Sequence, residues 1–392
     1  MMEWREFKIK DIADVVGGGT PSTAINEYWN GDIPWLTPKD LTGYIRNFIS
    51  HGERFITKKG LENSSARLLP KGTVLLTSRA PIGYVAIAEN EICTNQGFKS
   101  LVPNPDKAHN LFLLYWIKSN VEYLQSIGTG TTFQEISGSV LKDVDIILPP
   151  LPEQKAIAEV LSSLDDKIDL LTRQNKTLED LAQAYFRKWF IEDASDEWEV
   201  GKAENYFEIG IGKTPPRKEE HWFSKNKDDV VWISISDMGK SGMFIGDSSE
   251  YLTEDAVRRF NIKRVPKGAI ILSFKLTVGR VAIALREFTT NEAIAHFIYK
   301  NDYEREYLYF YLKTFDYYSL GSTSSIATAV NSKIIKDMPF IMPNIEALQK
   351  YHKIAAPIFS KIEYNTNQIL TLQKLRDTLL PKLISGEIRV KM

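Results

Sequence analysis

The sequence predicts an α+β protein made of two tandem α/β domains that are separated by two long antiparallel coiled-coil helices, with pseudo-two-fold symmetry. A heptad rhythm of apolar residues runs through 152–190 and again through 348–383. The segments that precede these two helices repeat one another at a spacing of about 196 residues. Each segment carries short β-branched strands, interrupted by Gly and Pro, and one late helical segment.

These patterns divide the chain into four parts. We expect a first α/β domain at 1–150, a central helix at 151–194, a second α/β domain at 195–343 and a C-terminal helix at 344–392. A helix of about 39 residues is roughly 58 Å long, far longer than either domain needs for internal packing. The two helices therefore act as spacers between the domains.

The two helices are expected to pair with each other. Segment 151–197 carries 6 Lys and Arg against 11 Asp and Glu, whereas 344–392 carries 8 against 4. Opposite charge favours mutual pairing over pairing with a second copy. The residues predicted to form the shared seam are Ile157, Leu161, Leu164, Ile168, Asn175, Ile362, Asn365, Ile369, Leu372 and Leu379.

Asn175 and Asn365 interrupt the two seams with polar side chains. We hypothesise that they pair and fix the register, because buried polar seam residues do this in coiled coils. Setting them opposite each other also places Ile157 near Leu383 and Trp189 near Tyr351. The heptad rhythm puts Tyr185 in the seam as well. Pro357 and Pro381 are each predicted to kink the second helix or to mark a boundary in it.

The repeat gives each domain the same predicted elements. The best-matched stretch is PKGTVLLTSRAPIGYVAIA at 70–88 against PKGAIILSFKLTVGRVAIA at 266–284. Further matches are DIPWLTPKDLTG with DVVWISISDMGK, and TNQGF with TNEAI. Strands are predicted at VLLTS, YVAIA and VDIILP in the first copy and at IILSF, RVAIA and MPFIM in the second. Helical segments are predicted at LFLLYWIKSNVEYLQS and YEREYLYFYLKTFDYYS.

Composition excludes several classes of protein. The single cysteine, Cys93, excludes an internal disulfide and favours the reducing cytoplasm. No run approaches the roughly 18 apolar residues of a membrane helix. The five histidines lack metal-site spacing, and Pro215 and Pro216 exclude the helix that a phosphate loop at 212–214 would need. No catalytic or metal-binding residue is assigned.

Polar, Gly-punctuated loops recur in both domains. Arg and Lys can bind phosphates and guanine, Asn and Gln suit adenine, and Glu suits cytosine. Taken singly, each loop is an ordinary surface turn, but two matched sets on one rod favour recognition of DNA. The candidate DNA-binding residues are Thr20, Ser22, Lys39, Ser78, Arg79, Tyr84, Asn95, Gln96, Thr129, Thr131, Thr132, Lys213, Thr214, Arg217, Ser236, Lys275, Arg280, Asn291, Glu292, Ser322, Thr323 and Ser324.

Where the two copies differ at matched loop positions, the bases they choose should differ too. The differing pairs are Ser78 and Phe274, Arg79 and Lys275, Tyr84 and Arg280, Gln96 and Glu292, and Gly97 and Ala293. We hypothesise that some of these pairs set base choice.

The chain resembles the DNA-specificity subunits of type I restriction-modification systems over almost its whole length. The stretches that carry the resemblance are GGGTPS with IPWLTPKDL, LTSRAPIGYVAIA, LPPLPEQKAIAEVLSSLDDKI and LLPKLISGEIRV. The second helix departs from the pattern, with PNIEALQKYHKIAAP where the first has PLPEQKAIAEVL. This departure makes docking residues on the second helix less certain.

The resemblance implies two target-recognition domains, each reading one half of a bipartite, asymmetric double-stranded DNA site. The helices would set the spacer and dock two methyltransferase subunits, and restriction (motor-nuclease) subunits would complete the assembly. It implies no catalytic centre in this chain, with S-adenosylmethionine, Mg and ATP expected in the partner subunits and a cytoplasmic location for the complex.

Two other readings stay open. The net charge of −1 argues mildly against a polyanionic partner and favours a non-DNA-binding coiled-coil scaffold or adaptor. An enzyme with an unrecognised site between the domains is the other alternative.

Overall fold

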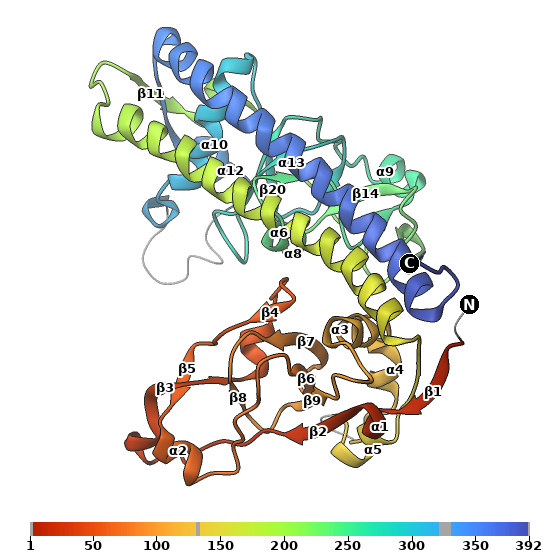
Figure 1. Cartoon of the computed structure of the whole chain (residues 1–392). Coiled ribbons are helices and arrows are strands. Elements are labelled where there is room, and N and C mark those ends of the chain that lie inside the picture. Colours follow the sequence, from red (N-terminus) through yellow and green to blue (C-terminus); the bar gives the residue numbers. More distant parts are fainter. Residues whose placement is uncertain (1–2, 131–133, 321–330, 391–392) are drawn as a thin grey trace. The chain divides into compact units, whose positions relative to one another are not determined.

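The computed structural model describes residues 3–130, 134–320 and 331–390, and the chain divides into two compact units (Figure 1). Unit 1 is Met1–Leu171 with Ile369–Met392, and unit 2 is Thr172–Gln368. Two long helices, α6 (Leu151–Arg187) and α13 (Ile345–Ser385), contribute one part to each unit. Each unit is thus an α/β domain together with a pair of helix segments. The finer division at 150, 194 and 343 stays a prediction.

Within the described residues of unit 1, the strands form sheets of five, three and two strands. Their orders are β2-β9-β6-β7-β4, β5-β3-β8 and β1-β10. The strands are β1 (Arg5–Lys8), β2 (Ala13–Gly17), β3 (Trp29–Leu36), β4 (Phe48–Ile49), β5 (Arg54–Ile56), β6 (Val74–Ser78), β7 (Ile82–Ala88), β8 (Cys93–Thr94), β9 (Lys99–Pro103) and β10 (Asp145–Leu148). The helices are α1 (Ile9–Ile12), η1 (Asn26–Tyr28), η2 (Pro38–Leu41), α2 (Lys58–Glu62), α3 (Asn110–Ser119), α4 (Val121–Ser126) and α5 (Gly138–Lys142).

The described part of unit 2 has sheets of five, four and two strands. Their orders are β12-β20-β17-β18-β15, β13-β16-β14-β19 and β11-β21. The strands are β11 (Glu199–Lys202), β12 (Glu208–Ile211), β13 (Phe223–Ser224), β14 (Val230–Ile233), β15 (Phe244–Ile245), β16 (Tyr251–Leu252), β17 (Ile270–Ser273), β18 (Val281–Ala284), β19 (Thr289–Thr290), β20 (Ile294–Ile298) and β21 (Pro339–Met342). The helices are η3 (Lys188–Glu192), α7 (Ala203–Tyr206), η4 (Glu220–Trp222), α8 (Ile235–Lys240), α9 (Glu254–Arg259), η5 (Asp302–Glu304), α10 (Arg305–Thr314), η6 (Tyr317–Leu320) and α12 (Ser332–Asp337).

The repeat in the sequence is a repeat in the structure. The two five-stranded sheets have corresponding orders, and in both the last strand (β4 or β15) joins its neighbour in parallel while the central strands are antiparallel. Even the register is shared: Val74 faces Ile87 across β6 and β7, and Ile270 faces Ile283 across β17 and β18. The predicted strands and helical segments are confirmed, and so is the tandem duplication.

The two long helices run antiparallel in both units, as predicted (Figure 1). In unit 2, Asn365 Nδ2 donates to Asn175 Oδ1 at 2.9 Å. The rings of Trp189 and Tyr351 lie 6.2 Å apart. The predicted pairing of the two asparagines is confirmed, and the proposal that they fix the register stays a prediction.

Two details of the helices differ from the prediction. Tyr185 is 38% exposed, and the buried ring at this end of α6 is its neighbour Phe186, which packs on Tyr307 and Phe310. The seam changes position here because Phe186 and Phe190 are the aromatic side chains that enter the unit 2 core. α13 continues as one helix through Pro357 and Pro381, so neither proline marks a boundary. Both prolines are exposed.

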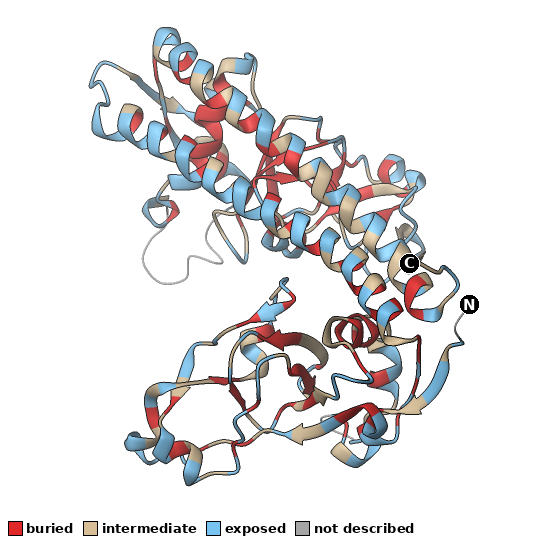
Figure 2. Cartoon of the chain, viewed as in Figure 1, coloured by how far each residue is buried: buried red, intermediate tan, exposed pale blue. Residues whose placement is uncertain are grey.

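The remaining predicted seam positions are buried to different degrees. Asn365 is fully buried and Asn175 is half-buried. The other buried positions are Ile157, Leu161, Ile168 and Ile362, and the half-buried ones are Leu164, Ile369, Leu372 and Leu379. Figure 2 shows the same gradation, with buried residues in the sheets and on the inner helix faces.

A buried carboxylate ties the first domain to both helix segments of unit 1. Asp165 on α6 accepts a hydrogen bond from the Tyr115 hydroxyl at 2.8 Å and pairs with Arg376 on α13 at 2.8 Å. Lys118 on α3 lies 3.5 Å away. Burial alone would raise the pKa of Asp165, but Lys118, Arg376 and the Tyr115 hydroxyl outweigh it and hold this pKa below its ordinary value. Asp165 is therefore charged in the folded protein.

The pairing of the asparagines can be measured by a double-mutant cycle. We expect Asn175→Ala and Asn365→Ala each to destabilise the protein, and the double variant to lose about 1 kcal/mol less than the sum of the two. The reason is that either single change already removes the hydrogen bond between the two amides, so the second change cannot remove it again. Urea unfolding of the four proteins gives the coupling, and strictly additive losses would contradict the pairing.

Replacing Asp165 tests the buried carboxylate. We expect Asp165→Asn to destabilise the protein by about 2–3 kcal/mol at pH 7, because Lys118 and Arg376 lose their pairing with this buried carboxylate. A carboxylate with a depressed pKa stabilises the fold above its unfolded pKa and loses this effect as the pH falls through the folded pKa. The difference from the parent protein should thus shrink below about pH 4.

Unfolding in urea at pH 7 and under acidic conditions checks this expectation. Asp166→Asn is the matched control, because Asp166 is the exposed neighbour on the same helix and the pKa of its carboxyl is raised by burial and by Asp165. Equal effects of the two substitutions at pH 7 would contradict the assignment.

Candidate nucleic-acid interface

In each unit, two of the predicted loops come together beside the five-stranded sheet. In unit 1, the Gly19 amide donates to the Thr94 carbonyl at 2.9 Å, and the Thr20 hydroxyl donates to Gln96 Oε1. The same pair of contacts recurs in unit 2. There the Lys213 amide donates to the carbonyl of Thr290 at 2.9 Å, and the loop is joined to Glu292 by a side-chain hydrogen bond.

Glycine is required where these loops cross. A Cβ at Gly18 would lie 2.0 Å from the Asn95 carbonyl oxygen, and a Cβ at Gly212 would lie 2.1 Å from that of Asn291. No side chain can occupy either position without movement of the backbone. Gly18 and Gly212 therefore each allow a close approach of two loops.

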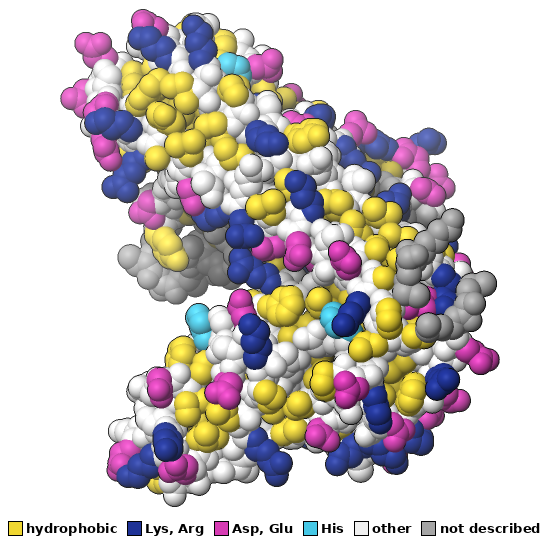
Figure 3. Space-filling view, viewed as in Figure 1, with side chains coloured by type: hydrophobic (Ala, Val, Ile, Leu, Met, Phe, Trp, Pro, Cys, Tyr) yellow, Lys and Arg dark blue, Asp and Glu magenta, His cyan; other side chains and the backbone are white. Residues whose placement is uncertain are grey.

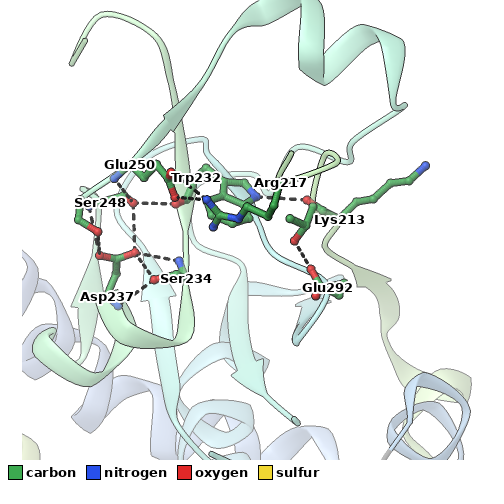
Figure 4. Close-up of polar contacts among 10 residues, drawn as sticks. Lys213, Arg217, Trp232, Ser234, Asp237, Ser248, Glu250 and Glu292 are labelled. Atoms are coloured by element: carbon green, nitrogen blue, oxygen red, sulfur yellow. Dashed lines mark hydrogen bonds and ion pairs between the residues drawn. The ribbon is translucent and has the colours of Figure 1, made fainter. Parts of the chain in front are cut away.

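In each unit, a tryptophan indole donates a hydrogen bond to the first of these loops. The indole of Trp35 on β3 donates to the Gly19 carbonyl at 2.9 Å, and that of Trp232 on β14 donates to the Lys213 carbonyl at 3.2 Å. Both indoles are almost fully buried. Figure 4 shows Trp232 beside Arg217 in unit 2, with its bond to the Lys213 carbonyl as a dashed line. The first loop of each unit is thus held by a buried ring.

The second loop of each unit is shaped by an asparagine. Asn95 Oδ1 accepts from the Gly97 amide at 2.9 Å, and Asn291 Oδ1 accepts from the Ala293 amide at 3.1 Å. These bonds form the same local turn in both copies. Asn95 and Asn291, both predicted to bind DNA, therefore have a structural role in their loops.

A second cluster in unit 2 surrounds Asp237 at the start of α8 (Figure 4). Its carboxylate accepts from the Ser234 hydroxyl at 2.6 Å and from the Ser249 hydroxyl at 2.9 Å. Burial alone would raise the pKa of Asp237, but these donors hold it below its ordinary value. Ser236, predicted to bind DNA, lies exposed on the same helix.

Two of the five differing pairs are buried. Ser78 is fully buried, and its hydroxyl donates to the Gly97 carbonyl at 3.2 Å. Its counterpart Phe274 is 1% exposed, and Gly97 and Ala293 are also buried. Ser78 is therefore a core residue of β6 rather than a surface ligand for DNA.

The other three pairs reach the surface. Gln96 and Glu292 are exposed, while Arg79, Tyr84, Lys275 and Arg280 are half-buried. Arg79 lies 3.5 Å from Glu135, which also pairs with Lys99 at 3.1 Å. Arg280 Nη1 donates to the Ile235 carbonyl at 2.6 Å. Gln96 and Glu292 are thus the differing pair that is most accessible to a ligand.

Several further predicted residues are exposed and have contacts of their own. Lys39 pairs with Glu53 at 3.0 Å, Lys213 Nζ donates to the Phe260 carbonyl at 2.6 Å, and Arg217 pairs with Glu250 at 2.8 Å. Ser22 and Thr129 are exposed. Thr131, Thr132, Ser322, Thr323 and Ser324 lie outside the described residues.

One basic residue beside these loops was missed by sequence reasoning. Arg54 on β5 stacks on Trp29 with its Cζ 3.7 Å from the ring centroid. The two residues are far apart in the sequence, so only the strand register of β3 and β5 brings them together. A basic residue in a short strand such as RFI carries no signal of this contact.

Among the described residues, no group of three or more His, Cys, Asp and Glu side chains could hold a metal ion. Two surface hollows, of about 370 and 340 Å³, contain none of the predicted DNA-binding residues.

In the same described part of the chain, no helix has both the length and the apolar character needed to cross a membrane.

Comparison with known proteins decides the family. The model described as "Type I restriction modification DNA specificity domain" matches residues 1–180 and 195–376. The chain belongs to the family of type I restriction-modification specificity subunits. The resemblance seen in the sequence is therefore confirmed. Specificity subunits are the non-catalytic component of the restriction-modification complex.

Two relatives match this chain over 99% of its length. The type I restriction enzyme MjaIX specificity subunit of Methanocaldococcus jannaschii is 39% identical over 415 residues, which are 99% of this chain and 94% of that protein. The HindI specificity subunit of Haemophilus influenzae is 24% identical over 99% of this chain and 100% of its own length. The crystal structure of the S subunit from M. genitalium has the same fold, with a TM-score of 0.57 and 18% identity over 100% of this chain and 97% of that one.

The close approach of the two loops predicts that adding one methyl group at Gly212 lowers the stability of the protein. We expect Gly212→Ala to destabilise the specificity subunit by about 1–3 kcal/mol, because its Cβ would force the backbones of two loops apart. Gly242→Ala is the matched control in the same unit, since no atom lies within 4 Å of its Cβ, and it should change stability by less than about 0.5 kcal/mol. Thermal unfolding measures both, and equal effects would contradict the role of Gly212.

Proposed function

We propose that each α/β domain of this specificity subunit reads one half of a bipartite, asymmetric DNA site. The observation that carries the proposal is that one loop scaffold occurs twice with different exposed side chains. Trp35 and Trp232 hold equivalent carbonyls, whereas Gln96 in one copy is Glu292 in the other. Two scaffolds of the same shape with different side chains can bind the same duplex geometry and select different bases.

The exposed pair has the chemistry for such a difference. A glutamine amide both donates and accepts hydrogen bonds and suits adenine, whereas a glutamate carboxylate only accepts and suits the amino group of cytosine. Each of these side chains is held by a hydroxyl of the neighbouring loop, Thr20 in unit 1 and Thr214 in unit 2. A side chain that is already positioned loses less entropy when it binds a base.

We further propose that the helices set the spacer and dock two methyltransferase subunits. Exposed apolar side chains stand on both helices in unit 2, with Leu181 46% exposed on α6 and Tyr364 57% exposed on α13. Figure 3 shows apolar side chains among charged ones on this surface. Apolar residues that a helix leaves exposed are candidates for packing against a partner.

The partners would supply the chemistry. An adenine must leave the stack to be methylated, and a methyltransferase would hold it together with S-adenosylmethionine. Mg and ATP would belong to restriction subunits, which act as motor and nuclease. In this division of work, the present chain chooses the DNA sequence and the partner subunits carry out the reactions. We place the complex in the cytoplasm.

The near-neutral charge favours one other function. A net charge of −1 is unusual for a chain that binds DNA alone, and it favours a scaffold that holds protein partners only. Under our proposal, the methyltransferases supply much of the phosphate contact and the isolated chain binds DNA weakly. A reconstituted complex that protects no bipartite site would favour the scaffold.

Domain exchange tests the proposal. We expect that replacing residues 1–150 by the first domain of another specificity subunit changes one half of the methylated sequence and leaves the other half and the spacer unchanged. The physical reason is that each loop set is held within its own unit. Single-molecule methylome sequencing of a host that expresses the chimaera and its methyltransferase gives the result.

The reciprocal exchange of residues 195–343 is the matched control, and it should change only the other half-site. A change of both halves in either chimaera would contradict separate reading. An unchanged site in both would show that the loops do not choose the bases.

A further inference from the structure

A stacked arginine lies directly beside the first recognition loop of unit 1. Arg54 on β5 is opposite Trp35 on β3 in the strand register. Its Cζ lies 3.7 Å from the ring centroid of Trp29 and 5.2 Å from that of Trp35. The two rings meet edge to face, with centroids 5.0 Å apart. The guanidinium is therefore attracted to two aromatic faces at once.

The rings that carry Arg54 are themselves fixed. Trp29 is 8% exposed and Trp35 is 2% exposed. Their indole N–H groups donate to the carbonyls of Ser22 at 3.1 Å and Gly19 at 2.9 Å. One pair of buried rings thus holds loop 19–22 by its edges and Arg54 by its faces. The cation and the loop keep a constant position relative to each other.

The charge of Arg54 is not neutralised by an acidic side chain in the described part of the chain. The side chain is exposed, and no carboxylate of a described residue lies within ion-pair distance. Unit 2 provides the contrast. Arg217 stacks on Phe223 at 4.3 Å and on Trp232 at 4.6 Å, yet it pairs with both carboxylate oxygens of Glu250 at 2.8 Å.

We propose that Arg54 binds a phosphodiester group of the DNA backbone next to the half-site read by unit 1. This inference rests on the proposed function. A guanidinium offers two parallel N–H donors that match the two oxygens of a phosphate, and its own aromatic stacking lowers the entropy lost on binding. Its place on an edge strand, fixed beside the loop, suits a contact that positions the duplex more than one that reads a base.

The test compares four versions of the specificity subunit, each assembled with its methyltransferase. They are the parent chain, Arg54→Ala, Arg54→Lys and Arg5→Ala. Arg5 is the matched control, because it is an exposed arginine of the same unit on β1, in a separate sheet. Fluorescence anisotropy with labelled duplexes measures Kd at several salt concentrations. The duplexes carry the methylated site or a single changed base pair within it.

For Arg54→Ala we expect a loss of affinity of about 10-fold, equivalent to one charge-assisted contact. The slope of log K against log salt should become shallower by about 0.9, the value for one phosphate. The loss should be the same on every duplex. Arg54→Lys should recover part of the affinity and the full slope, because it keeps the charge without the planar fork, and Arg5→Ala should bind like the parent.

Two outcomes would overturn the inference. One is an Arg54→Ala complex that binds with the parent affinity and salt slope. The other is a loss that depends on which base pair was changed, since that would make Arg54 a base contact. If the parent complex itself binds no duplex in preference to another, the proposed function fails instead, so the two failures are distinguishable. Thermal unfolding of the variants confirms that each is folded.

Discussion

Each α/β domain completes its hydrophobic core with residues of both long helices, and the rest of the structure depends on this. The core of unit 1 includes Ile157 of α6 and Leu383 of α13, together with the central strands and α3. The core of unit 2 includes Phe186 of α6 and Tyr351 of α13. Because burial of apolar surface is the main stabilising term, neither domain can keep its full stability without its pair of helix segments. The antiparallel arrangement follows, since unit 1 takes the first part of α6 and the last part of α13, and unit 2 takes the other two parts.

This shared core explains why the two junctions into the helices differ in sequence. Gln154, 1% exposed, accepts from the His109 amide and donates to the carbonyls of Lys107 and Pro149, each at 2.9 Å. At the corresponding place in the second copy stands Leu348, 2% exposed and part of the unit 2 core. One junction is held by a hydrogen-bonded amide and the other by apolar packing. The departure of the second helix from the family pattern is thus a change of stabilising interaction at an equivalent position.

Much of the fold could be predicted from the sequence because it depends on the heptad spacing of apolar residues and on the repeat of one segment. The heptad rhythm predicts the helix pairing, and the polar interruption in each seam predicts that the two asparagines meet, as they do. The sequence predicts less well which side chains of a strand face the core. Ser78 and Arg79 are adjacent, and only the ladder of β6 with its neighbours shows that the serine faces the core. Arg54 was missed for a related reason, since its partners Trp29 and Trp35 are brought to it by strand pairing.

The two copies keep the bonds that shape their loops and differ where side chains are exposed. The indole bonds, the asparagine turns and the glycine crossings are all present twice, and each of them is buried or half-buried. Substitution of these groups costs stability, because it leaves buried polar groups unpaired or forces backbones apart. Substitution at Gln96 or Glu292 leaves the core packing untouched. Under the proposed function, a module built in this way could change the bases it reads without losing its fold, and a duplicated module could do so independently in each copy.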